Sequence, residues 1–185
     1  PAVAADGVDF AIVRAGNRGY TEGALYADER FSENVDGAEA AGLATGVYFF
    51  SQAVTPDEAR EEADFVLGLL AGRPLDLPVA FDHEPVSDET GRANHLAGTE
   101  LAACARAFCE RIEQAGYDTL VYGNKRDIAR FGGDVPDGRP VWFAEYDVAV
   151  PTGQFDFVMW QYTSTGTVAG ISTRVDLNIR FDAVG

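Results

Sequence analysis

Apolar residues along the chain alternate between short runs typical of buried strands and longer stretches with a helical period. The strand-like runs span residues 9–16, 45–50, 78–84, 119–122, 140–146, 155–162 and 175–178. The helical stretches span residues 32–41, 55–70, 99–115 and 125–131. The polar segment between them at residues 17–29 is expected to form a loop.

This alternation predicts an α/β fold in which a parallel, closed or nearly closed sheet is surrounded by helices. The expected architecture is an irregular, TIM-like (β/α) barrel. A complete barrel of this type has eight strands, and seven of the eight are visible in this chain. The active-site residues of such barrels lie at the carboxyl ends of the strands.

Composition and charge narrow the possible partners. The 185 residues carry a formal net charge of −16, which argues against non-specific binding to nucleic acid and against electrostatic attachment to anionic membranes. No apolar run approaches the roughly 18 residues that a membrane span needs, and no signal peptide is visible. The two cysteines and two histidines lack metal-binding spacing, so no metal is expected.

The sequence Phe-Asp-His-Glu places two acids, Asp82 and Glu84, at the end of a predicted strand. Side chains two positions apart on a strand share a face, so both should point into the barrel mouth with Cα atoms roughly 6.6 Å apart. Repulsion should raise at least one pKa, and a carboxyl that keeps its proton can protonate a leaving oxygen. The alternative is a solvated acidic strand end without a role. His83 should face the helices instead.

Aromatic residues near other strand ends suggest a sugar-binding cleft, because their rings combine an apolar face with a polar edge. Tyr48, Tyr122 and Trp160 are expected to line this cleft. Trp142 is assigned to the barrel core instead. Asp176, on the last predicted strand, is expected to converge on the same mouth unless it is an ordinary surface acid.

Taken in order along the chain, these residues resemble glycoside hydrolase family 25, the muramidases called Chalaropsis-type lysozymes. The segments that carry the resemblance are residues 7–16, 28–34, 40–50, 61–65, the Asp82-x-Glu84 pair, 140–147, 159–163, 170–171 and 175–178. Each segment is unspecific alone, whereas the ordered set is specific. The resemblance favours the catalytic interpretation of the two acids over a solvated strand end.

The resemblance implies hydrolysis of the β-1,4 bond between N-acetylmuramic acid and N-acetylglucosamine in a peptidoglycan glycan strand. Glu84 would be the general acid/base, and Asp82 would orient and polarise the group that stabilises the oxocarbenium-like centre. The residues implied to bind the sugar are Asp176, Tyr48, Tyr122, Trp160 and Gln161. No metal or organic cofactor is implied, and the protein is expected to be a monomer that is secreted or located at the cell wall.

The chain departs from the family at its start. Family members open with a strand that reads roughly Gly-x-Asp-x-Ser-x-x-Gln and brings an Asp to the active site, whereas residues 1–6 align with the helix after that strand. Residues 1–185 are therefore expected to form a single catalytic barrel domain that is N-terminally incomplete. Strand 9–14 and the strand of Asp176 would then lose their shared neighbour and leave unpaired edges.

Three explanations of this departure remain open: a partial sequence, a strand supplied by another chain, or a degenerate relative. Two functional alternatives also remain. One is a catalytically impaired module that binds cell-wall glycan with the same barrel. The other is a hydrolase that acts on chitin or another amino-sugar polymer, because a fold alone does not determine function.

Overall fold

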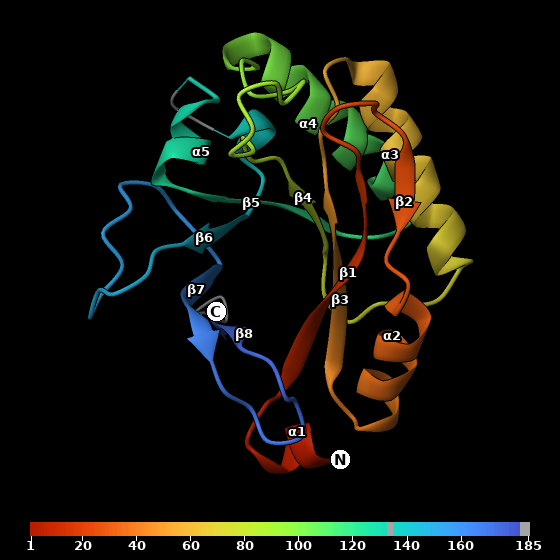
Figure 1. Cartoon of the computed structure of the whole chain (residues 1–185), viewed down its shortest axis with the longest axis vertical. Coiled ribbons are helices and arrows are strands. Elements are labelled where there is room, and N and C mark those ends of the chain that lie inside the picture. The colour runs from red at the N-terminus through yellow and green to blue at the C-terminus, as the bar shows by residue number, and fades with distance from the viewer. Residues whose placement is uncertain (133–134, 182–185) are drawn as a thin grey trace.

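The computed structural model describes residues 1–132 and 135–181. Within these residues one curled sheet has the strand order β2-β1-β3-β4-β5-β6-β7-β8 (Figure 1). The strands are β1 (Phe10–Arg18), β2 (Leu25–Ala27), β3 (Ala44–Phe50), β4 (Val79–Asp82), β5 (Thr119–Asn124), β6 (Val141–Ala144), β7 (Met159–Gly166) and β8 (Val175–Arg180). The helices are α1 (Ala2–Ala5), α2 (Phe31–Ala40), α3 (Pro56–Leu70), α4 (Gly98–Glu113) and α5 (Lys125–Ala129), with a 3-10 turn at Pro136–Gly138.

The predicted fold class is confirmed, but two of its details are wrong. The segment expected to be a loop contains β2, which pairs antiparallel with Gly16–Arg18 of β1. The sheet is also not purely parallel, because β8 runs antiparallel to β7. A parallel crossover needs a dozen or more residues, and only residues 167–174 join these two strands, so they form a hairpin instead.

The strand expected at residues 155–162 begins later, at Met159. The preceding aromatics are in a loop that covers β6, where Phe155 and Phe157 pack against Phe143 with ring centroids 5.0 Å and 5.4 Å apart. An apolar run alone does not distinguish a strand from a loop that packs against the core.

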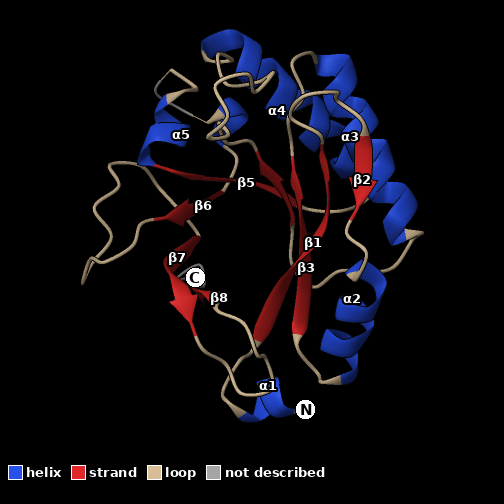
Figure 2. Ribbon diagram, in the orientation of Figure 1, coloured by secondary structure: helices blue, strands red, loops and turns tan. Residues whose placement is uncertain are grey.

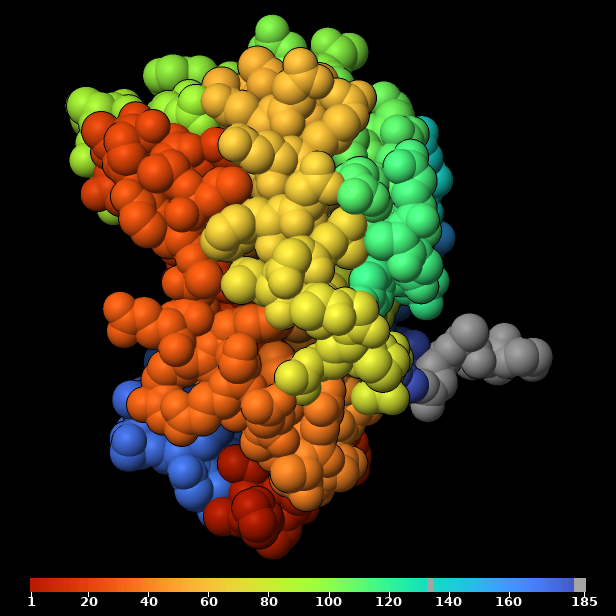
Figure 3. All heavy atoms as spheres, turned by 90° about the vertical axis from the view of Figure 1, so that its right-hand side faces the viewer, coloured from red at the N-terminus to blue at the C-terminus, as the bar shows by residue number. Residues whose placement is uncertain are grey.

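The two faces of the curled sheet have different partners. Helices α2, α3 and α4 cover the outer face (Figures 2 and 3), and the larger core lies between them and the sheet, with Phe49, Phe81 and Phe108 fully buried. A smaller cluster of Ala80, Leu120, Trp142 and Met159 fills the inner face. No helix in the described part of the chain has both the length and the apolar character of a membrane span.

Helix α3 is joined to β1 by a buried ion pair. The helix follows Thr55, whose hydroxyl accepts a hydrogen bond from the Glu58 N–H at 3.2 Å, a standard N-cap. One turn further, Glu62 is fully buried and its Oε1 lies 2.8 Å from Nε of Arg18. Arg18 also donates to the carbonyls of Gly23 at 2.6 Å and Glu58 at 2.9 Å. This one side chain therefore fixes the carboxyl end of β1 against α3.

The sheet has two unpaired edges within the described residues, as the sequence predicted. Strand β2 covers β1 only at Gly16–Arg18, and β8 is the last strand in the order. Helix α1 lies beside the turn between β7 and β8 (Figures 1 and 3), where the Asp6 carboxylate accepts a hydrogen bond from the Ala169 N–H at 2.8 Å. The space between β1 and β8 is thus bridged at one end by a helix rather than by a strand.

The close approach of β2 to β1 predicts a strong effect of a methyl group at Gly16. A Cβ there would lie 2.1 Å from the Tyr26 carbonyl oxygen, so we expect Gly16→Ala to lower the free energy of unfolding by about 1–3 kcal/mol in urea titrations. Gly68→Ala is the matched control, because a Cβ on that exposed residue of α3 meets nothing within 4 Å. The control should be stabilised by up to about 1 kcal/mol. An unchanged midpoint for Gly16→Ala would contradict the β1–β2 pairing.

Candidate active site

The acids Asp82 and Glu84 lie at the end of β4, on the inner face of the sheet. Their carboxyl groups are within hydrogen-bonding contact of each other, which is the arrangement that period-two alternation predicts. Burial, followed by the charge of Glu84, raises the pKa of Asp82 well above its usual value. Burial raises the pKa of Glu84 to about 7. Oδ1 of Asp82 is buried without a hydrogen-bond partner in the described residues, which also favours a neutral carboxyl.

The backbone that carries these acids is held from two sides. The Gln52 side chain donates from Nε2 to the Glu84 carbonyl at 2.8 Å, and Arg130 donates to the His83 carbonyl at 2.9 Å. Gln52 is itself positioned by α3, because its N–H donates to the Glu62 carboxylate at 3.3 Å. Two donors on successive carbonyls restrict rotation of the peptide and therefore fix the direction of the Glu84 side chain.

His83 faces the helix layer, as predicted, and is buried beside Phe81. Its Nδ1 lies 3.3 Å from an Arg130 nitrogen and its Nε2 lies 3.2 Å from the Ala53 carbonyl. Because arginine only donates, Nδ1 must accept and the proton must be on Nε2. Burial, followed by the charge of Arg130, lowers the pKa of His83 to about 4, so this residue is a neutral structural group.

Polar aromatics surround the two acids on the inner face. The Tyr122 hydroxyl donates to Oε1 of Gln161 at 2.7 Å, and the Tyr146 hydroxyl donates to the same oxygen. Burial raises the pKa of Tyr122, and the charge of Glu84 raises it further. The hydroxyls therefore stay protonated as hydrogen-bond donors, and Gln161 serves as their shared acceptor.

Trp142 packs against the tyrosines of the site. Its ring packs edge-on against Tyr122 at a centroid distance of 4.7 Å and against Tyr48 at 6.3 Å. Its Nε1 donates to the Asn178 side chain on β8 at 2.8 Å. Trp142 is buried, in agreement with its assignment to the barrel core, and it fixes the spacing of the two tyrosines.

The structure brings six of the seven predicted site residues together. Asp176 lies on β8, where its charge raises the pKa values of both Tyr48 and Tyr146, and burial raises the pKa of Tyr48 to about 12. The exception is Trp160, which points to the other face of β7 from Gln161. It packs in the larger core and its Nε1 donates to the Glu145 carbonyl at 2.9 Å.

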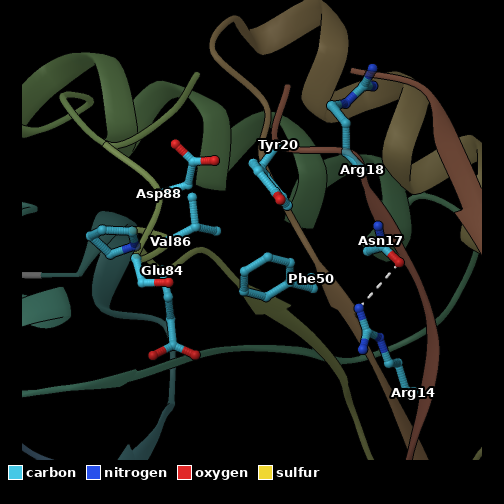
Figure 4. A pocket seen from close by; sticks show the side chains of 10 residues that line it. Arg14, Asn17, Arg18, Tyr20, Phe50, Glu84, Val86 and Asp88 are labelled. Atoms are coloured by element: carbon cyan, nitrogen blue, oxygen red, sulfur yellow. Dashed lines mark hydrogen bonds between the residues drawn. The ribbon is translucent and has the colours of Figure 1, made fainter. Parts of the chain in front are cut away.

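A groove of about 460 Å³ opens beside Glu84 (Figure 4). Phe50 lies in its middle, with Glu84 on one side and Arg14 on the other. Arg14 donates to the Asn17 side chain at 3.1 Å and its guanidinium lies 6.0 Å from the centre of the Phe50 ring. Of the seven predicted site residues, Glu84 is the one that lines this groove, so the groove extends from Glu84 toward β1 rather than toward Tyr122 and Gln161.

Sequence reasoning missed several residues of this site. Arg14 was counted only as part of a strand, although its position two residues after Ile12 marks it as inward-facing. Asp127 and Arg130 lie in and just after the short helix α5 and reach Glu84 and His83 across the sheet. Asn124 and Asp127 form a capping box, a pattern readable from their spacing, but nothing local shows that the box lies beside β4.

Comparison with known proteins identifies the family of the chain. The model of the family "Glycosyl hydrolases family 25" matches residues 1–171. The autolytic lysozyme of Clostridium acetobutylicum is 29% identical over 177 residues, which cover 96% of this chain and 50% of the relative. Lysozyme M1 of Streptomyces globisporus is 29% identical over 184 residues, which cover 93% of this chain and 60% of that protein. The chain thus spans about half to three-fifths of these relatives.

A solved structure of a bacterial lysozyme has a similar fold. The crystal structure of the bacterial lysozyme from Streptomyces coelicolor superposes with a TM-score of 0.80 at 25% sequence identity. The superposition covers 99% of this chain and 86% of that one.

The contacts of Arg130 predict a large cost for its removal. Arg130→Gln loses donors to the carbonyls of His83 and Leu96, and we expect a loss of about 1–3 kcal/mol for the buried acceptors left unpaired. Arg126→Gln is the control, because Arg126 is exposed in α5, about one turn before Arg130. Urea denaturation followed by tryptophan fluorescence measures both. Equal midpoints for the two variants would show that Arg130 does not support the end of β4.

Proposed function

The chain belongs to glycosyl hydrolase family 25, and we propose that it hydrolyses the β-1,4 bond between N-acetylmuramic acid and N-acetylglucosamine in peptidoglycan. The observation that carries this proposal is the Asp82–Glu84 pair on the inner face, where the pKa of Glu84 is raised to about 7. Glycoside cleavage needs a carboxylic acid that is still protonated when the substrate binds. The relatives named lysozymes support the same reaction.

In this proposal Glu84 is the general acid/base. Its carboxyl donates a proton to the oxygen of the departing sugar as the glycosidic bond breaks, and its carboxylate then accepts a proton from the attacking water. Asp82, which is buried more deeply, orients and polarises the group that stabilises the oxocarbenium-like centre. The two acids titrate as a coupled pair, so the loss of the first proton makes the second harder to remove.

Sugar binding falls to the polar groups around the pair. Tyr48, Tyr122 and Gln161 present hydroxyl and amide groups on the inner face, and Asp176 adds a carboxylate on β8. Trp160 contributes indirectly, because it holds the Glu145 carbonyl just before Tyr146. With a net charge of −16, the protein must hold an anionic polymer by local hydrogen bonds and stacking rather than by long-range attraction.

The proposal extends to the setting of the reaction. We place the protein outside the cell or at the cell wall, acting as a monomer without metal or organic cofactor, with residues 1–185 as its catalytic barrel domain. The alternative of a glycan-binding module with little turnover remains distinct, because it requires binding without cleavage.

Product analysis tests the bond that is cut. The wild-type chain should release peptidoglycan fragments whose new reducing ends are muramic acid, detected by borohydride reduction and mass spectrometry. Glu84→Gln should lower the rate by about 10²–10⁴-fold, and Asp82→Asn should also lower it. Glu110→Gln, at an exposed position of α4, is the control and should cleave normally. New ends of N-acetylglucosamine, or binding without new ends, would refute the proposal.

The pKa of Glu84 predicts the pH range of the reaction. Since the reactive form is the protonated acid and the pKa is about 7, kcat/KM should hold up to neutral pH and fall about tenfold per unit above it. An ordinary glutamate, with a pKa of about 4.3, would lose activity far earlier. A pH profile at constant ionic strength measures the midpoint. A decline that begins near pH 5 would rule out Glu84 as the proton donor in this environment.

A further inference from the structure

Asp127 is a third carboxyl group beside the acid pair, and the reaction proposed above gives it no role. It lies in the first turn of α5 and is only 4% exposed. Its Oδ2 accepts a hydrogen bond from the Asn124 N–H at 3.2 Å, while Oδ1 of Asn124 accepts from the Asp127 N–H at 3.3 Å. A reciprocal cap of this kind fixes the side chain in one direction.

The chain is built to bring this turn close to the sheet. Gly123 precedes the capping residue, and a Cβ on it would lie 2.8 Å from the Cβ of Asp127. A larger residue at this position would therefore push the first turn of α5 away from β5. Strand β5 is the neighbour of β4, with Tyr122 opposite Asp82, so the folded-back turn brings Asp127 to the side of Glu84.

The Asp127 carboxyl is within hydrogen-bonding contact of the Glu84 carboxyl. On its other side, Oδ1 lies 3.9 Å from an Arg130 guanidinium nitrogen, and the same nitrogen donates to the His83 carbonyl. Asp127 thus lies between Arg130, whose guanidinium holds the backbone at the end of β4, and Glu84.

Several charged or titratable groups act on Glu84 from the surrounding elements. They are Asp82 from β4, Tyr122 from β5, Asp127 from α5, Arg130 after α5 and Tyr146 after β6. Arg14 and Asp88 are the other charged residues that line the groove with Glu84 and Arg18. After burial, the charge of Asp127 is the largest influence on Glu84, and it exceeds the opposing effect of Arg130. Burial therefore sets the upward direction of the shift in the pKa of Glu84, and the charge of Asp127 adds to it.

We propose that Asp127 is a positioning residue that keeps the proton on Glu84, by accepting a hydrogen bond from the Glu84 carboxyl. This role rests on the proposed function, in which Glu84 must enter the reaction protonated. Burial raises the pKa of Asp127 above its ordinary value, and the Asn124 N–H and the Arg130 cation offset part of that rise by stabilising the carboxylate. The carboxylate does not touch the substrate and does not take up the proton; it makes ionisation of its neighbour unfavourable.

Asp127→Asn tests this role directly, because asparagine keeps the shape and an oxygen acceptor for the Asn124 N–H but carries no charge. Carbon-13 NMR of the assigned Glu84 carboxyl, recorded without substrate, should show its titration midpoint falling by about one pH unit or more. Where the chain is active, the upper midpoint of the kcat/KM profile should fall equally. Asp118→Asn, an exposed change just before β5, is the matched control and should shift neither midpoint.

Two further variants separate charge from structure. Asp127→Glu keeps the charge and should leave the Glu84 midpoint within a few tenths of a unit of wild type. If Asp127→Asn does not fold, Asp127→Ser retains a hydroxyl acceptor for the cap and should show the same downward shift. An unchanged Glu84 midpoint in the folded neutral variant overturns the proposal.

The NMR titration needs no turnover, so it is independent of the proposed function. A chain that cuts no peptidoglycan but shows the Glu84 shift would refute the muramidase assignment and leave the interaction of the two carboxyls established. A chain that cuts peptidoglycan but shows no Glu84 shift would support the muramidase assignment and refute the role of Asp127.

Discussion

Two ionised carboxyl groups would repel each other at the positions of Asp82 and Glu84, at the partly buried end of β4. An isolated side chain would relieve this repulsion by rotating toward solvent, so the protein has to prevent that movement. It does so through the backbone, where Gln52 and Arg130 hold the carbonyls of Glu84 and His83. Because the acids cannot move apart, ionisation of their carboxyl groups remains unfavourable, and the pKa values of both are raised.

The support for this arrangement extends well beyond the acids. Arg18 on β1 binds Glu62 on α3, Glu62 accepts from the Gln52 backbone, and the Gln52 side chain reaches Glu84. Removal of one partner from a buried ion pair leaves an uncompensated charge, which is far more costly than the loss of an exposed pair. The orientation of the Glu84 carboxyl thus depends on residues that lie on the far side of the sheet.

The sequence predicted those parts of the site that follow from local geometry. Alternation along a strand correctly placed Asp82 and Glu84 on one face and His83 on the other. Trp160 was expected near the sugar because it lies close to the predicted carboxyl end of a strand. In β7 it is next to Gln161, and adjacent side chains of a strand point to opposite faces, so the two residues cannot both face the cleft.

What the sequence did not predict are the contacts made across the fold. Arg130 and Asp127 reach β4 only because α5 folds back over Gly123, and no periodicity in the chain records that approach. The antiparallel ends of the sheet were missed for a related reason. They depend on the length of one hairpin connection and on a three-residue strand, which are too short to give a clear pattern.

The order of strands also determines which parts of the site resist local unfolding. Strand β4 has hydrogen-bonded neighbours on both sides, whereas β8, which carries Asp176, is bonded only to β7 within the described residues. Local opening of a protein begins where backbone hydrogen bonds are fewest. The part of the cleft formed by β8 is therefore expected to open more readily than the end of β4. In the proposed function, this difference would let a glycan strand enter and leave while the two acids keep their positions.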